Sequence, residues 1–238
     1  MRQSAYLLQP EEKNMFRRIV VPLFLLLLLC VSALAQTSSP PEMPTRKIKG
    51  QTLTSAEMPA VRLEVGKDFK YVGGHKFILY DVAHAEQHFF VDADKEGRVK
   101  RLYWVQFEGY LPTNTHTYNY KGAKTVNIGG LDFFADVYAR NIKANPGRPD
   151  SDAAKGRAFL ESKGYRFGSD EIISQRFLHY IGEEKRNELM IIYLEDMTPL
   201  GVTAADLAKG GKSEARMPEI SEAFFSRALR DIKLVRTN

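Results

Sequence analysis

The feature that most constrains the fold is a succession of short strand patterns joined by tight turns. Residues 61–65 alternate apolar and polar side chains, which is typical of a strand with one buried face. Further strand patterns follow at residues 69–72, 75–82, 87–91, 99–107, 116–121 and 125–128. The connections are too short for the crossovers that parallel strands require. We therefore predict a mainly antiparallel sheet.

Two local details belong to this prediction. Gly73 and Gly74 are expected to form a hairpin turn between the strand patterns on either side of them. Residues 131–140 fit a strand and a helix equally well, because their apolar side chains satisfy both periodicities.

Helical patterns follow the proline- and glycine-containing break at residues 145–149. Ser151 or Asp152 can cap a helix that ends at Gly164. After two more strand patterns, at 172–180 and 189–194, Pro218 opens a final helix. The apolar stripe of that helix comprises Ile220, Phe224, Phe225, Ala228, Leu229 and Ile232.

These patterns predict an α+β fold. The sheet is mainly antiparallel and curved, a long C-terminal helix packs on it, and one or two shorter helices complete the structure. We expect all helices to cover one face of the sheet.

The N-terminal residues predict export. Arg17 and Arg18 precede a leucine-rich apolar run that ends in Ala33-Leu34-Ala35, which is the pattern of a signal peptide with a small-x-small cleavage site. We assign residues 1–35 to this signal, with Met15 as an alternative start. A second interpretation is an uncleaved anchor, because residues 19–35 are at the short limit for spanning a bilayer.

The region after the signal predicts a linker and one domain. Residues 36–49 are rich in proline and serine at their start and are interpreted as a disordered linker. Residues 50–238 then form a single α+β domain. The only cysteine, Cys30, lies within the signal, so the mature chain has neither a disulfide nor a thiol nucleophile. Lipidation of Cys30 is disfavoured because Leu29, before it, is not small.

The charge argues against nucleic-acid binding. The first 35 residues hold four of the 34 basic and two of the 29 acidic residues, which leaves the mature chain a net charge of +3. Such a nearly balanced domain lacks the strong positive charge of a nucleic-acid binder. We expect the partner to be a small molecule or an envelope protein, and membrane contact only through an uncleaved signal.

One candidate metal site stands out. His84, Glu86 and His88 alternate along a strand pattern, so their side chains share one face. Two imidazoles and a carboxylate could bind a divalent metal and leave a position open for water. Their spacing differs from the His-Glu-x-x-His motif of zinc proteases, and no further ligand follows.

A second candidate site is aromatic. Trp104, Gln106, Glu108 and Tyr110 are expected on one face of a strand, opposite Tyr103, Val105 and Phe107. A face that mixes aromatic and polar side chains suits a ligand groove. Ordinary packing of aromatic residues is the competing interpretation. The predicted ligand-binding residues are Trp104, Tyr110, Tyr118 and Tyr120.

The sequence contains no Gly-x-Ser-x-Gly elbow and no other specific catalytic motif. We therefore predict an exported, non-enzymatic domain, periplasmic or extracellular, that binds a small apolar or amphipathic ligand or an envelope partner, without a cofactor. The alternatives are a metal-dependent hydrolase that uses His84, Glu86 and His88, and a structural component of a larger assembly.

Overall fold

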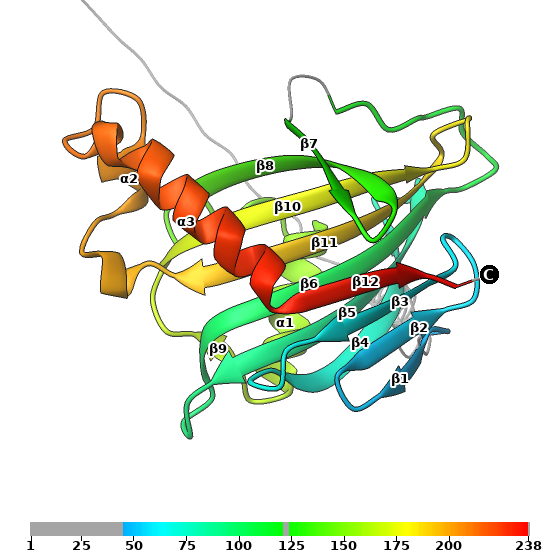
Figure 1. Ribbon diagram of the computed structural model, residues 1–238, viewed down its shortest axis with the longest axis horizontal. Helices are drawn as coiled ribbons and strands as arrows, with labels where there is room; N and C mark the ends of the chain where they lie inside the picture. The colour runs from blue at the N-terminus through cyan, green and yellow to red at the C-terminus, as the bar shows by residue number, and fades with distance from the viewer. Residues whose placement is uncertain (1–44, 121–123, 238) are drawn as a thin grey trace, which may run out of the picture. The chain divides into compact units, whose positions relative to one another are not determined.

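A large, curved antiparallel sheet dominates the fold (Figure 1). The computed structural model describes residues 45–120 and 124–237, all within a compact unit that spans Pro41–Asn238. In the order in which they pair, the strands of this sheet are β4 (Lys70–Leu79), β5 (Ala83–Ala93), β6 (Arg98–Tyr110), β11 (Asn187–Asp196), β10 (Glu171–Ile181), β8 (Leu131–Asn141) and β7 (Lys124–Ile128). The short β9 (Arg166–Phe167) pairs in parallel with β6. The edge strands β4 and β7 do not pair with each other, so the sheet is open.

A smaller antiparallel sheet and three α-helices complete the unit. The strands of the smaller sheet, in pairing order, are β1 (Lys47–Lys49), β2 (Thr52–Ser55), β3 (Val61–Val65) and β12 (Ile232–Arg236). The helices are α1 (Asp152–Ser162), α2 (Ala204–Leu207) and α3 (Met217–Arg230), with 3-10 turns η1 (Thr198–Leu200) and η2 (Glu214–Arg216). The predicted antiparallel α+β fold is therefore confirmed at this level.

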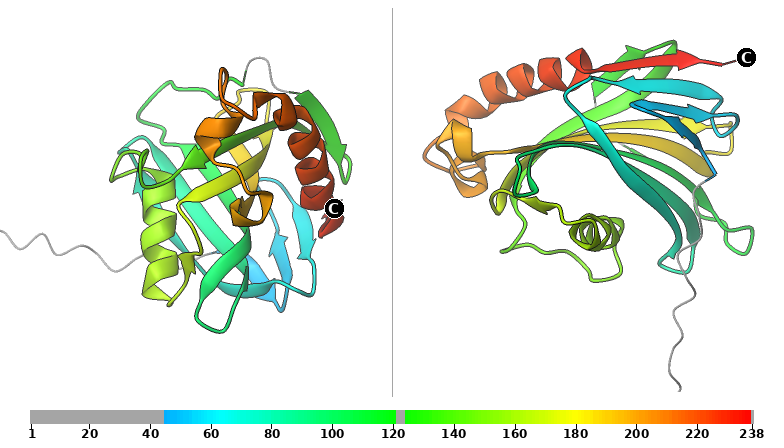
Figure 2. Two further views of the ribbon diagram at one scale, coloured as in Figure 1. Left: turned by 90° about the vertical axis from the view of Figure 1, so that its left-hand side faces the viewer. Right: turned by 90° about the horizontal axis from the view of Figure 1, so that it is seen from below.

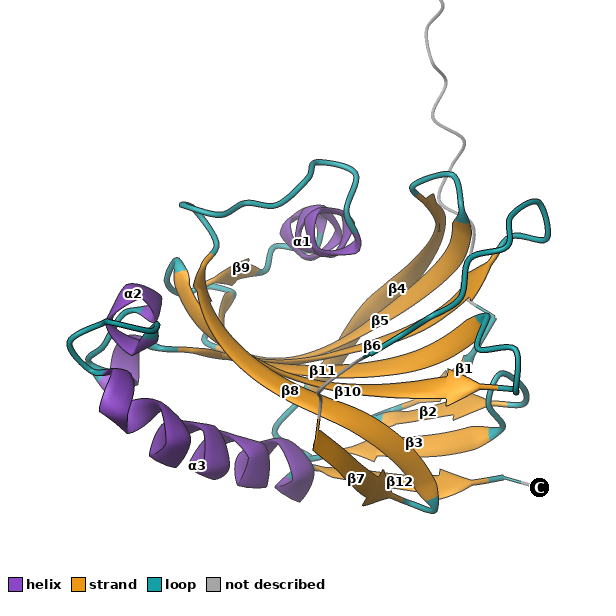
Figure 3. Ribbon diagram, turned by 90° about the horizontal axis from the view of Figure 1, so that it is seen from above, coloured by secondary structure: helices purple, strands orange, loops and turns teal. Residues whose placement is uncertain are grey.

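The helices cover both faces of the large sheet, and the prediction that they share one face is wrong. Figure 3 shows α1 within the curve of the sheet, while α3 and the smaller sheet lie on the opposite side. A second view shows the same separation (Figure 2). We call the side covered by α1 the inner face and the side covered by α3 and the smaller sheet the outer face.

The outer face carries the main core of the domain. Phe224 of α3 is fully buried and its ring centroid lies 5.1 Å from that of Tyr193 on β11. The hydroxyl of Tyr103 donates a hydrogen bond of 2.8 Å to the carbonyl of Ala228. Each fully buried side chain of this size stabilises the fold by roughly 1.5–3 kcal/mol. The predicted packing of α3 on the sheet is confirmed.

The final helix is shorter than its apolar stripe suggested. It ends at Arg230, and Ile232 belongs to β12, so a long helix does not end the chain. Residues 232–236 alternate in burial as a strand does, and Leu234 lies opposite the buried Leu63 of β3. Ile232 fits the helical spacing only because two adjacent elements happen to be in phase.

The hairpin predicted at Gly73 and Gly74 is also wrong. Strand β4 runs through both glycines with a bulge, and the turn lies at residues 80–82. Gly73 has a φ of +128°, and a Cβ there would approach the ring of Phe159 on α1 to 2.9 Å. This glycine is thus required for the bulge and for the close approach of α1, not for a turn.

Three other boundaries differ from the sequence prediction. Lys47–Lys49 form β1, so the folded unit begins within the predicted linker of residues 36–49. Residues 111–120 contain no strand, although residues 116–121 were predicted as one. The open choice at residues 131–140 is resolved as strand β8. The predicted signal peptide, Cys30 and residues 36–44 lie outside the described residues.

Candidate functional site

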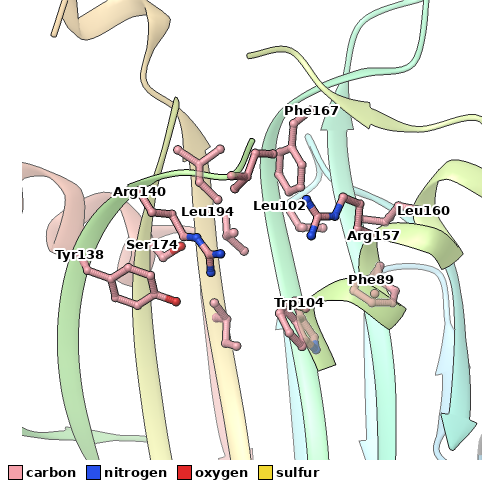
Figure 4. Close-up of a pocket in the computed structure, with 15 residues that line it drawn as sticks. Phe89, Leu102, Trp104, Tyr138, Arg140, Arg157, Leu160, Phe167, Ser174 and Leu194 are labelled. Carbon is pink, nitrogen blue, oxygen red and sulfur yellow. The ribbon is translucent and has the colours of Figure 1, made fainter. Parts of the chain in front are cut away.

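A partly open cavity lies between α1 and the inner face of the large sheet (Figure 4). Its volume is about 60 Å³. Its apolar lining includes Phe89, Leu102, Trp104, Leu160, Ile172 and Ile192. We call it the inner cavity. A single water molecule needs roughly 10–15 Å³ of such space, so the inner cavity has room for a small group.

Two arginines reach the inner cavity from different elements. Arg140 comes from β8 and Arg157 from α1, and Figure 4 shows both guanidinium groups directed into the space between the sheet and the helix. Each donates a hydrogen bond to the loop before α1: Arg140 to the carbonyl of Asn145 at 2.5 Å, and Arg157 to that of Pro146 at 3.0 Å. Within residues 45–120 and 124–237, neither guanidinium lies within 4.0 Å of a carboxylate.

Two hydroxyl groups lie on the same wall. Ser174 on β10 is 1% exposed, and its Oγ forms no hydrogen bond with any described residue. Tyr138 is its register partner on β8, and both residues line the inner cavity. A buried hydroxyl without a partner is unfavourable by about 1–3 kcal/mol. A ligand that accepts a hydrogen bond from the Oγ of Ser174 would remove this cost.

Helix α1 closes the inner cavity with few buried residues of its own. Ser151 caps it by accepting a hydrogen bond from the amide of Ala154, as one of the two predicted alternatives had it. Only Gly156 and Leu160 of the helix are buried. A Cβ at Gly156 would meet the ring of Phe89 at 3.1 Å, so glycine allows the helix to lie close to the sheet. Partly buried Phe159 adds a stacking contact with the sheet, with ring centroids 5.5 Å from Phe89 and 4.6 Å from His75. The helix therefore covers the cavity mainly through Gly156, Phe159 and Leu160.

A second, wider cavity adjoins the first. It has a volume of about 410 Å³ and shares Ile142, Arg157, Leu160 and Phe167 with the inner cavity. We call it the outer cavity. Its other charged residues balance one another, since Lys143 and Arg166 face Glu161 and Asp170. The four shared residues therefore lie at the boundary between the inner cavity and the wider outer cavity.

Beside the inner cavity, a hydrogen-bonded chain of polar side chains crosses the inner face. His75 contacts the Oε1 of Gln87 at 2.7 Å, and Gln87 donates to Gln106 at 2.8 Å. Gln106 in turn donates to Glu108 at 2.6 Å and accepts from the indole of Trp104 at 3.1 Å. The chain satisfies its buried amide groups and holds the indole in place beside the cavity.

The chain ends in a pair of buried carboxyl groups. Glu108 on β6 and Glu188 on β11 are register partners, so their side chains point to the same face. Burial raises the pKa of both, to about 8 for Glu188, and the charge of Glu108 adds to the rise at Glu188. Tyr118 donates to Glu108 at 2.8 Å and Tyr120 to Glu188 at 2.5 Å. These bonds tie residues 111–120 to the sheet.

The predicted aromatic residues lie on the inner face, but only one lines the inner cavity. Trp104 lines it, on the opposite side of β6 from Tyr103, as the alternation predicted. Tyr118 and Tyr120 bind the two glutamates, and Tyr110 stacks on Tyr118 with ring centroids 4.5 Å apart. The structure therefore groups the tyrosines around the carboxyl pair and places Trp104 at the cavity.

The geometry gives the metal hypothesis no support. His84 is exposed, whereas Glu86 and His88 are buried and bonded to each other at 2.8 Å. Tyr71 occupies the other ring nitrogen of His88 at 3.0 Å. Across the described residues, no group of three potential ligands could hold a metal ion.

Glu86 instead anchors the start of the described chain. Arg46 binds it at 2.7 Å through its guanidinium and at 3.0 Å through its backbone amide, and Thr45 adds two further hydrogen bonds. Burial opposes the ionised form of Glu86, but the bonds from His88, Arg46 and Thr45 outweigh it and hold its pKa well below the ordinary value.

Sequence reasoning missed Arg140, Arg157 and Ser174. Arg140 ends a stretch that fitted two kinds of element, and Arg157 lies among the polar positions of a helix. For Ser174 the sequence predicts only that the residue lies in a strand. No local signal distinguishes these residues from ordinary surface positions, because they meet only when β8, β10 and α1 come together.

Neither the known protein families, nor the curated proteins, nor the solved structures include a match to this chain. Among the residues that the structure describes, there is no helix with the length and hydropathy needed to cross a membrane.

Proposed function

We propose that this domain binds a small apolar or amphipathic molecule between α1 and the inner face of the large sheet. The observation that carries the proposal is the inner cavity, a mostly apolar and partly open space with a wider cavity beside it. Ligand sites are concave and mostly apolar, with a few polar groups that orient the ligand. The inner cavity and its four polar residues have this composition.

The size of the inner cavity limits the ligand. An engineered apolar cavity of 150 Å³ binds benzene, whereas the inner cavity measures about 60 Å³. A short apolar segment fits without rearrangement. A longer chain extends into the outer cavity or displaces α1, of which only two residues are buried.

Export remains part of the proposal. It rests on the signal-like residues 17–35 alone and places ligand binding in the periplasm or outside the cell.

The test uses the only tryptophan of the chain, Trp104, as a reporter in the cavity wall. The neutral probe N-phenyl-1-naphthylamine is larger than the inner cavity, so it must also occupy the outer cavity or displace α1. Its addition to protein stripped of lipid is expected to quench the emission of Trp104 at a saturating stoichiometry of one.

The matched pair of variants is Ala153→Leu and Ala158→Leu. Ala153 lines the cavity and Ala158 is exposed on the same helix. We expect Ala153→Leu to weaken probe binding at least tenfold by filling the space, and Ala158→Leu to change it less than twofold. Equal affinities in these two variants, or no saturable quenching in the unmodified protein, would refute the proposal.

A further inference from the structure

We infer that the inner cavity selects an amphiphile with a carboxylate head group, of the medium-chain fatty acid type. The inference rests on the proposed function and adds the chemistry of the ligand. It is drawn from the four polar residues at the cavity, Tyr138, Arg140, Arg157 and Ser174, and from what they lack.

Both charged residues in the wall of the inner cavity are positive. The carboxyl of Asp152, at the start of α1, interacts electrostatically with Arg140 but forms no ion pair with it within 4.0 Å. The lining includes Arg140 and Arg157 and, among the described residues, no aspartate or glutamate. The other arginines on or near the inner face differ in this respect, since Arg176 is held by Asp136 at 2.5 Å. Two guanidinium groups that line one cavity repel each other, and an anion between them reduces this repulsion.

The hydrogen-bond donors also fit an oxyanion. Each guanidinium has five N–H groups, and one of them is engaged with the loop carbonyls of Asn145 or Pro146. The Oγ of Ser174 is buried and unpartnered among the described residues, so it can donate to an oxygen of a bound head group. Figure 4 shows Tyr138 with its hydroxyl directed to the same space. Forked guanidinium donors bind a planar carboxylate through two parallel hydrogen bonds.

The apolar part of the lining sets the rest of the ligand. Phe89, Trp104 and Leu160 lie on the side of the inner cavity away from Arg140 in Figure 4. At about 60 Å³ the inner cavity is smaller than the 150 Å³ cavity that binds benzene, so it holds only the first part of one alkyl chain. The rest of the chain extends into the outer cavity or displaces α1. The small volume of the inner cavity also favours a planar carboxylate head group over a bulkier tetrahedral phosphate.

The experiment compares three probes with the same chain: octanoate, 1-octanol and octyl phosphate. Each is titrated into lipid-stripped protein at pH 7 with Trp104 fluorescence as the readout. We expect octanoate to bind most tightly, because it alone combines the charge with the compact head. Arg140→Gln and Arg157→Gln should each weaken octanoate about 10- to 100-fold, as expected for the loss of a hydrogen bond to a charged group. Ser174→Ala should weaken it about tenfold.

The controls separate this inference from the proposed function. Both arginines also hold the loop before α1, so 1-octanol binding is measured in each variant and should change less than twofold if the cavity is intact. Arg148→Gln is the matched control, because Arg148 is exposed and bound to Asp150 at 2.8 Å. It should leave all three affinities unchanged.

Two results would overturn the carboxylate assignment while leaving the proposed function standing. One is octanol binding as tight as octanoate binding and insensitive to Arg140 and Arg157. The other is tighter binding of octyl phosphate than of octanoate. Absence of binding by all three probes would instead refute the proposed function itself.

Discussion

Glu188 offers the sharpest prediction about stability. Its side chain is 2% exposed and accepts a hydrogen bond of 2.5 Å from Tyr120. Burial raises its pKa from the ordinary 4.5 to about 8, and the neighbouring Glu108 contributes to the rise. The folded protein therefore holds a proton at neutral pH that the unfolded chain has released. Glu188→Gln should remove this dependence, because glutamine keeps the shape and can still accept from Tyr120.

The sign and size follow from proton linkage. A group whose pKa is raised on folding contributes stability that is fully present below the unfolded pKa and is lost as the pH rises through the folded pKa. For Glu188 this window runs from about pH 4.5 to about pH 8. Each pH unit within it changes the free energy of unfolding by at most about 1.4 kcal/mol. Between pH 6 and pH 8 the free energy of unfolding should fall by about 2 kcal/mol.

The assay is urea denaturation at pH 6 and pH 8 for the unmodified protein, Glu188→Gln and Glu183→Gln. Glu183 lies exposed in the turn between β10 and β11 and serves as the matched control. Over this pH range the free energy of unfolding should fall by about 2 kcal/mol more in the unmodified protein and the control than in Glu188→Gln. Because the two buried carboxyl groups titrate as a pair, the difference measures the pair rather than Glu188 alone. Equal pH dependence in all three proteins would refute the reasoning.

Three further predictions concern the outer face and the start of the domain. Arg46→Ala should lower the free energy of unfolding by about 3 kcal/mol, because it removes the nearer of the two cations paired with the buried Glu86, Arg46 at 2.7 Å and Lys76 at 4.0 Å. Arg62→Ala, in an exposed pair, should lower it by less than about 1 kcal/mol in the same urea melts. Phe224→Ala should lower it by about 3–5 kcal/mol, and a loss below about 1 kcal/mol would show that α3 is not part of the core. Zinc titration should give no heat that His88→Ala abolishes, because both ring nitrogens of His88 have partners. A stoichiometric signal lost in that variant would restore the metal hypothesis.

The sequence predicted the local elements well where one periodicity prevailed. The alternation of residues 102–108 correctly placed Trp104 and Tyr103 on opposite faces of β6. The capping residue Ser151 marked the start of α1, and Pro218 lies in the first turn of α3. Side-chain period and end signals are properties of neighbouring residues, so they can be recognised without knowledge of the rest of the chain.

The tertiary structure decided which face each helix covers and which residues meet. An alternating strand has two faces, and its sequence does not say that α1 takes one while α3 takes the other. Ile232, the first residue of β12, was predicted in the helix because the partner strand β3 lies more than 160 residues earlier, and pairing at that distance leaves no local signal in the sequence. Gly73 resembled a turn because the bulge that needs it depends on Phe159 of α1.

Almost all of the candidate site was decided by the tertiary structure. The aromatic residue Trp104 could be assigned to a ligand face from its strand, because alternation is local. Arg140, Arg157 and Ser174 could not, since each is unremarkable in its own element and becomes a possible anion ligand only beside the others. Whether an arginine has an acidic partner, and whether a hydroxyl has a hydrogen bond, depends on which residues surround it in the folded protein. The sequence by itself therefore determined the strands and helices. The packing of α1 on β4 and β5, across the cavity from β8 and β10, determined the chemistry of the cavity.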